Sequence, residues 1–87
     1  MKHKYPIVAI HYTDPSYYTG YYDSRTTEFS PSEVYITGHL VFQNDKKVVI
    51  AQECFDDADS EKDIRYVTCV PRICVVEMET LHGQSKD

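Results

Sequence analysis

Hydrophobic and polar residues alternate along most of this chain, with the period of two residues that is typical of β-strands. The pattern is clearest over residues 34–55, where two apolar runs flank the polar residues 44–47, Asn-Asp-Lys-Lys. Strand-forming residues on both sides of a short charged turn indicate a β-hairpin. We therefore predict that this hairpin is the structural centre of a small all-β domain.

Three further segments carry the strand pattern, namely residues 6–13, 64–70 and 74–81. Pro71 has no backbone N–H to donate to a ladder, so we expect it to end the strand before it. We find no internal repeat and no convincing helical segment. The chain is therefore predicted to contain five short strands, with one turn at Pro71 before the last of them.

The alternation also predicts which side chains share a face of the sheet. Within each predicted strand, the residues expected on one face are Val8, Ile10 and Tyr12; Val34, Ile36, Leu40 and Phe42; and Val76 and Met78, opposite Glu77 and Glu79. Gly38 lies within the second of these sets, and a glycine inside a strand marks a bend, a bulge or a close backbone approach. We expect the strand to bend there, so that it serves both halves of a barrel.

Residues 14–32, DPSYYTGYYDSRTTEFSPS, interrupt the strand pattern. Asp-Pro at the start and Ser-Pro near the end are turn signals, and the segment is longer than most connections. Its apolar residues are almost all aromatic: Tyr17, Tyr18, Tyr21, Tyr22 and Phe29. Loops of this length are usually functional or disordered, and the aromatic content argues against disorder.

We call residues 14–32 the tyrosine loop, and it is the strongest candidate for a binding surface. The candidate binding residues are Asp14, Tyr17, Tyr18, Tyr21, Tyr22 and Arg25. Tyrosine supplies a large contact area at low entropic cost in binding loops, and its ring can also stack on a base. An alternative is that half of these rings fold back and cover the open end of a small barrel.

The order of the predicted strands is similar to that of the SH3-like small barrels. The long first loop, the glycine in the second strand and residues 70–75, Val-Pro-Arg-Ile-Cys-Val, carry this resemblance. It implies a five-stranded antiparallel SH3-like barrel with the tyrosine loop between strands one and two. Recognition of proline-rich peptides is not expected, because the chain has no tryptophan and Cys74 stands at the position of the groove tyrosine.

The chain also resembles a loose group of small bacterial and phage proteins with no assigned activity. The shared features are Tyr12-Thr13-Asp14 at the end of the first strand, Thr37-Gly38-His39-Leu40-Val41, Val48-Val49-Ile50-Ala51 and the turn Val70-Pro71-Arg72. This resemblance implies a fold and no activity.

Length and charge limit the classes of function. The 87 residues allow one domain, residues 1–87, with an ordered core over about residues 6–81. The formal net charge of −5 argues against a general nucleic-acid binder, which needs a basic surface. We expect a protein partner instead, and an open sheet edge with a tyrosine-rich surface also makes a homodimer plausible.

The cysteine content predicts a reducing compartment. Three cysteines are an odd number, and no apolar segment near the start has the pattern of a signal peptide. Free thiols in the cytoplasm are therefore expected, not a disulfide framework. No run approaches the roughly 20 apolar residues that cross a bilayer, so no membrane association is predicted.

Two sets of residues resemble metal sites but have the wrong spacing. Residues 57–63 have a carboxylate at every second position, yet Lys62 and Thr68 stand where an EF-hand loop needs glycine and glutamate. The second set is His39 with three thiols, Cys54, Cys69 and Cys74. Structural zinc sites usually contain a closely spaced cysteine pair, which is absent here, and the thiols are expected to be small buried hydrophobes.

The predicted function is therefore a non-catalytic protein-interaction module that acts through the tyrosine loop, with no metal and no cofactor. No phosphate loop, zinc-protease motif or nucleophile elbow is present, and no catalytic geometry is fixed for His11 or His39. Small size, acidic charge and the lack of a catalytic motif fit a phage or mobile-element accessory protein, such as a counter-defence inhibitor. The alternative is a small-ligand protein that holds a nucleotide between tyrosines at a subunit interface.

Overall fold

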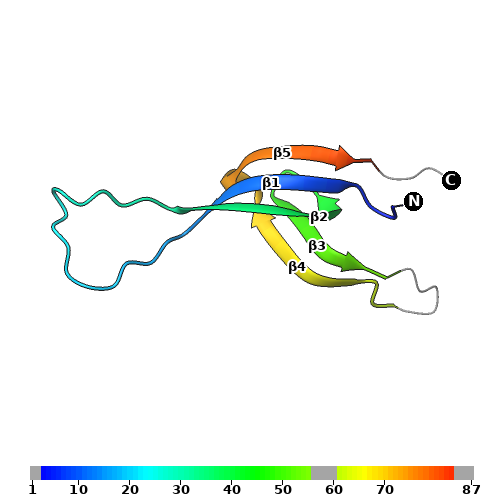
Figure 1. The fold of residues 1–87 in the computed structure, drawn as a ribbon, viewed down its shortest axis with the longest axis horizontal. Helices are drawn as coiled ribbons and strands as arrows, with labels where there is room; N and C mark the ends of the chain where they lie inside the picture. Colours follow the sequence, from blue (N-terminus) through cyan, green and yellow to red (C-terminus); the bar gives the residue numbers. More distant parts are fainter. Residues whose placement is uncertain (1–2, 56–60, 84–87) are drawn as a thin grey trace.

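A single five-stranded antiparallel sheet forms this domain (Figure 1). The computed structural model describes residues 3–55 and 61–83. Its elements are β1 (Ile7–Asp14), β2 (Ser32–Gln43), β3 (Lys47–Cys54), β4 (Ile64–Pro71), the 3₁₀ helix η1 (Arg72–Cys74) and β5 (Val75–His82). The strand order across the sheet is β4-β3-β2-β1-β5, so the predicted all-β class and the five strands are confirmed.

The predicted central hairpin consists of β2 and β3, and its polar turn is organised by one asparagine. The side-chain oxygen Oδ1 of Asn44 accepts hydrogen bonds from the backbone N–H groups of Lys46 and Lys47, each at 2.9 Å. The backbone N–H of Asn44 donates to the carbonyl of Lys47 at 3.0 Å. Asparagine favours such turns because its short side chain bonds the backbone two or three residues on.

Strand β2 changes its pairing partner near Gly38. Residues from Ser32 to His39 pair with β1, whereas residues from His39 onward pair with β3. A Cβ atom on Gly38 would lie 2.6 Å from Cγ2 of Ile50 and 2.9 Å from the carbonyl oxygen of Ala51. The glycine therefore permits a close approach of β3, which confirms one of the reasons expected for its presence.

The hydrophobic core lies on one face of the sheet. Four buried aliphatic side chains form its centre: Val8, Ile10, Val48 and Ile50. Around them pack the partly buried side chains of Tyr12, Ile36, Leu40, Val75 and Met78. The common face predicted for the first strand is confirmed, because Val8, Ile10 and Tyr12 all contact this core.

Two side chains do not lie on the face that they were predicted to share with their neighbours, because irregularities in the ladders change the alternation. A register shift between Leu40 and Phe42 pairs Phe42 with Val49, on the opposite face from Ile50, and half of Phe42 is exposed. A second shift lies opposite Val76, which is also mostly exposed. An extra residue in a strand moves the side chains that follow it to the opposite face of the sheet. The sequence pattern does not indicate where such an extra residue lies.

The sheet is open, so the predicted barrel is not confirmed. Strands β4 and β5 are its two edges, and no ladder joins them in the described residues. The predicted turn after Pro71 is present as η1, which connects these edges along the chain. Arg72 at its start donates from its backbone N–H to the carbonyl of Lys46 at 2.8 Å and from Nε to the carbonyl of Asn44 at 3.1 Å.

A polar link joins the segment before β1 to the segment before β4. Lys4 Nζ lies 2.7 Å from Oδ2 of Asp63, and the hydroxyl of Tyr5 donates to the same oxygen at 3.2 Å. The hydrogen bond from Lys4 lowers the pKa of the Asp63 carboxyl. Partial burial and the neighbouring Asp63 carboxylate raise the pKa of Tyr5.

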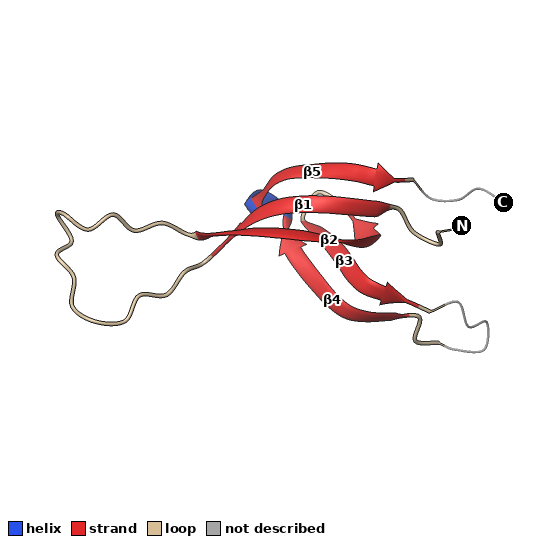
Figure 2. Ribbon diagram, in the orientation of Figure 1, coloured by secondary structure: helices blue, strands red, loops and turns tan. Residues whose placement is uncertain are grey.

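The tyrosine loop gives the molecule an elongated shape. In Figure 2 the loop extends from the ends of β1 and β2 well beyond the sheet. The principal extents are 58 × 24 × 23 Å and the radius of gyration is 17.0 Å. A compact domain of this length would have a radius of gyration of about 12 Å. Much of the loop surface is therefore available for contact with another molecule.

Candidate functional site

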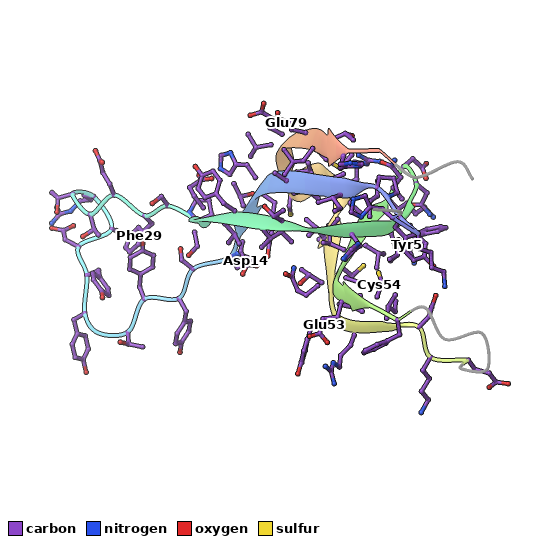
Figure 3. The ribbon with its side chains drawn as sticks, turned by 45° about the vertical axis from the view of Figure 1, so that its right-hand side comes forward. Tyr5, Asp14, Phe29, Glu53, Cys54 and Glu79 are labelled. Atoms are coloured by element: carbon purple, nitrogen blue, oxygen red, sulfur yellow. The ribbon has the colours of Figure 1, made fainter. Side chains whose placement is uncertain are left out.

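The tyrosine loop stands apart from the sheet and does not cover its core. Beyond Asp14 the chain leaves β1 and returns at Ser32, and Figure 3 shows Phe29 within the loop, far from the sheet. Tyr17 and Tyr21 show 91% and 105% of their reference exposure. The alternative that these rings fold back over the end of a barrel is therefore wrong. The side chains that form the core and pack against it all come from the strands, and none comes from residues 15–31.

Three aromatic rings pack against one another inside the loop. The ring centroids of Tyr18 and Phe29 are 5.0 Å apart, those of Tyr22 and Phe29 are 5.7 Å apart, and those of Tyr18 and Tyr22 are 5.9 Å apart. All three pairs meet edge to face, which is a favoured geometry for aromatic rings. We call Tyr18, Tyr22 and Phe29 the ring cluster, and it gives the loop a small apolar centre of its own.

Hydrogen bonds connect the two arms of the loop beside the ring cluster. The Tyr18 hydroxyl donates to the carbonyl of Ser30 at 3.2 Å and accepts from its backbone N–H at 3.3 Å. The hydroxyl of Ser16 donates to the same carbonyl. Because the N–H of Ser30 stabilises the phenolate form, the pKa of Tyr18 is lowered.

The tip of the loop is shaped by one glycine and one aspartate. Gly20 has a φ of +124°, a conformation that side chains rarely allow, and the Tyr22 hydroxyl donates to the nearby carbonyl of Thr19 at 2.8 Å. Asp23 accepts from the backbone N–H of Arg25 at 2.9 Å and from its Nε at 3.2 Å. These bonds from Arg25 lower the pKa of Asp23.

The six residues predicted for this site therefore have four different positions. Tyr18 and Tyr22 belong to the ring cluster, and Arg25 is held by an aspartate of the loop. Asp14 is the last residue of β1, at the base of the loop. Tyr17 and Tyr21 have no ring contact within the described residues and are the two rings most open to solvent. The structure thus separates rings that hold the loop together from rings that face outward.

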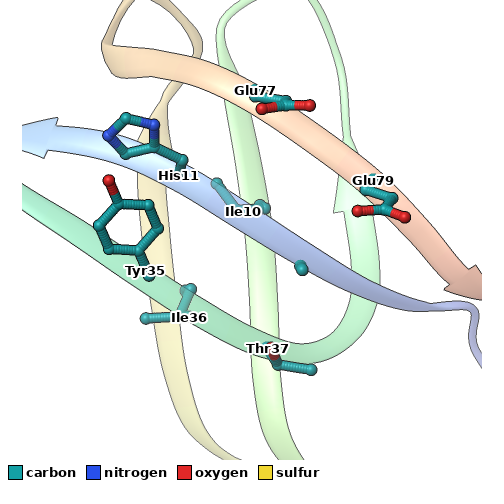
Figure 4. A pocket seen from close by; sticks show the side chains of 8 residues that line it. Ile10, His11, Tyr35, Ile36, Thr37, Glu77 and Glu79 are labelled. Carbon is teal, nitrogen blue, oxygen red and sulfur yellow. The ribbon is translucent and has the colours of Figure 1, made fainter.

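Sequence reasoning did not find a groove on the face of the sheet away from the core. We call it the β1 groove, and its volume is about 240 Å³. Two cross-strand rows over β2, β1 and β5 line it: Tyr35, His11 and Glu77; then Thr37, Ala9 and Glu79 (Figure 4). The outward face of β5 was predicted to carry both glutamates, but their neighbours follow only from the strand order and register.

The three cysteines are free thiols in three separate environments. Cys54 and Cys74 are half-buried, and Cys69 is exposed on β4. The expectation that all three are buried is wrong for Cys69, because it pairs with Val49 while the neighbouring pair of Val48 and Val70 takes the core-facing positions. Burial raises the pKa of the Cys54 thiol, which lowers its reactivity.

Within residues 3–55 and 61–83, no group of three His, Cys, Asp or Glu side chains is placed to hold a metal ion. The acidic segment that resembles the start of an EF-hand lies partly outside the described residues. No helix in this same part of the chain is long and apolar enough to span a membrane. Comparison of the chain with protein-family models, with curated proteins and with solved structures finds no match.

Proposed function

We propose that this protein is a non-catalytic protein-interaction module and that the outward rings of the tyrosine loop contact its partner. The observation that carries the proposal is the division of roles within the loop. The ring cluster and the bonds from Tyr18 to Ser30 fix the arms of the loop. Tyr17 and Tyr21 are left exposed on this framework.

Physical reasoning favours a protein partner for such an arrangement. Exposed tyrosines are common anchors of protein interfaces, because each buries a large ring and has few rotatable bonds to immobilise. A framework that is already ordered reduces the entropy lost on binding. The elongated shape keeps this surface away from the sheet, so a partner has steric access to it.

The nucleotide alternative has no observation in its favour. Arg25 is the only basic residue in residues 14–32, and it is already paired with Asp23. An anionic ligand between the tyrosines would therefore meet no free cation of the loop. The packed rings of the cluster meet edge to face and leave no parallel pair between which a base would stack.

The strand order and the 3₁₀ turn before β5 also support our proposal of an SH3-like small-barrel fold, in which the sheet serves as scaffold for the loop. The narrower hypotheses concern biological role: a phage or mobile-element accessory protein, a counter-defence inhibitor, or a cytoplasmic homodimer. The identity of the partner and the oligomeric state in solution would test these directly.

The proposal is tested by comparative affinity capture from the native host, followed by mass spectrometry. The wild type is compared with a Tyr17→Ser/Tyr21→Ser variant. The matched control is Ile73→Ser/Val76→Ser, which removes two exposed apolar side chains that lie outside the tyrosine loop. A partner retained by the wild type and the control but lost by the tyrosine variant supports the proposal.

The proposal fails if the tyrosine variant captures the same proteins as the wild type while a direct binding assay with the purified partner gives the same Kd. Thermal shift with a panel of nucleotides provides the opposing test. A saturable rise in Tm with a nucleotide would favour the small-ligand alternative.

A further inference from the structure

The β1 groove combines an aromatic ring, a low stretch of sheet at Ala9 and two glutamate carboxylates. Ala9 has the smallest side chain of the eight lining residues and lies between Thr37 on β2 and Glu79 on β5. The sheet surface is therefore low at Ala9 and rises on both sides. Tyr35 stands at the edge of this depression with 73% of its surface exposed.

The aromatic side of the groove is fixed by contacts among its own residues. The His11 ring stacks on Tyr35, with 4.3 Å between centroids and an interplanar angle of 16° (Figure 4). The Nε2 atom of His11 also lies 2.5 Å from a carboxylate oxygen of Glu33. His11 is thus engaged on two sides, and it lies between Tyr35 and Glu77 in the cross-strand row.

The acidic side of the groove is formed by Glu77 and Glu79. These residues are two apart on β5 and so project from the same face, about 7 Å apart along the strand. Neither carboxylate has a hydrogen bond or an ion pair with any residue in the described ranges. Two like charges side by side repel each other, and a cation between them would relieve that repulsion.

The size of the groove decides between kinds of cationic ligand. Pockets for small-molecule ligands usually span about 300–1,000 Å³, which is larger than this groove. A volume of about 240 Å³ fits one long side chain better than a nucleotide or a cofactor. The formal net charge of −5 adds a long-range attraction for a basic partner.

We propose that the β1 groove binds an arginine side chain of a protein partner, with its aliphatic chain over Ala9 and its guanidinium between Glu77 and Glu79. A guanidinium offers five N–H donors in one plane, so it can bridge two carboxylates. Lysine has a compact charge and lacks this planar fork. The groove is separate from the tyrosine loop, and it rests on the proposed function only in that the arginine comes from a protein.

The test uses the full chain, with N-acetyl-arginine amide as probe and backbone amide NMR as readout. Saturable shifts centred on Ala9, Thr37 and Glu79 are expected, with little effect from the uncharged N-acetyl-citrulline amide. In Glu77→Gln/Glu79→Gln the apparent Kd should rise by about tenfold or more, because hydrogen bonds to charged groups are the strong ones. An unchanged Tm verifies that this variant is folded.

The matched control is Glu28→Gln/Asp45→Asn, which removes the same number of exposed carboxylates elsewhere. It should bind the arginine probe as the wild type does. Equal shifts with the citrulline probe, equal binding of N-acetyl-lysine amide, or an equal loss in the control variant would overturn the assignment. Chemical-shift changes of the groove residues that depend on protein concentration alone would also overturn the assignment, because a second copy of the chain would then cover the groove.

The two proposals fail independently. Tyr17→Ser/Tyr21→Ser should leave the binding of the arginine probe unchanged, since neither residue lines the groove. Loss of probe binding in this loop variant would contradict the separation of the two sites.

Discussion

Because Gly38 has no side chain, strand β3 can pack closely against β2 at this position. Replacing it by alanine places a Cβ against Ile50 and the backbone oxygen of Ala51. We expect the free energy of unfolding to fall by about 1–3 kcal/mol, the usual cost of overpacking. Equilibrium urea denaturation measures this, with Gly83→Ala as the control, since no atom lies within 4 Å of the Cβ it would add. An equal loss in both variants would contradict the explanation.

The pKa values of two tyrosines are expected to differ from the ordinary tyrosine pKa in opposite directions. The N–H of Ser30 lowers the pKa of Tyr18, whereas partial burial and the Asp63 carboxylate raise the pKa of Tyr5. NMR titration of tyrosine ¹³Cζ signals should therefore show Tyr18 ionising before Tyr5. Tyr18→Phe and Tyr5→Phe assign the two curves. The reverse order of ionisation would show that the Tyr18–Ser30 contact is not formed in solution.

At the scale of elements, the loop and the sheet should be independent in stability. The variant with Tyr17, Tyr18, Tyr21 and Tyr22 all replaced by serine is expected to keep the β-sheet signal in circular dichroism. Its unfolding free energy should change little, because none of these rings packs on the core. Ile10→Ala, which opens the core, should cost about 2–5 kcal/mol. Unfolding of the four-serine variant would instead make the loop part of the core.

Sequence alone predicted most of the elements of this fold. The five strands follow from alternation, and Pro71 and the Asn44 turn follow from backbone chemistry, all of which act over a few residues. The face of the sheet on which Phe42 and Val76 lie was not predictable, because a register shift depends on the partner strand. Closure into a barrel depends on contacts between β4 and β5 that no local pattern describes.

The candidate sites were predictable to different degrees. The composition of the tyrosine loop drew attention to the correct segment, but which rings face outward depends on how Phe29 and Tyr18 pack. The β1 groove was missed, because Tyr35, His11 and Glu77 are neighbours only through the register of three strands. The one local sign was the pair of glutamates on the outward face of the last strand.

At the scale of the whole molecule, the link between Lys4 and Asp63 predicts sensitivity to acid. Because the pKa of Asp63 is lowered by folding, the link stabilises the protein above the ordinary carboxyl pKa of about 3.9. This stabilisation is lost as the pH falls through the lowered value in the folded protein. The unfolding free energies of the wild type and Asp63→Asn should therefore differ at pH 6 and converge toward pH 2–3. A constant difference across that range would exclude a contribution from ionised Asp63.

The change of partner along β2 has a consequence for the order of folding. The turn between β2 and β3 closes over residues 44–46, whereas pairing of β1 with β2 must enclose residues 15–31. The entropy lost on closing a chain segment grows with its length, so the short hairpin forms at the lower cost. The β2–β3 hairpin is thus the expected folding nucleus, and β1 joins later. Since β1 supports both the tyrosine loop and the β1 groove, both binding surfaces would be completed only in the last steps of folding.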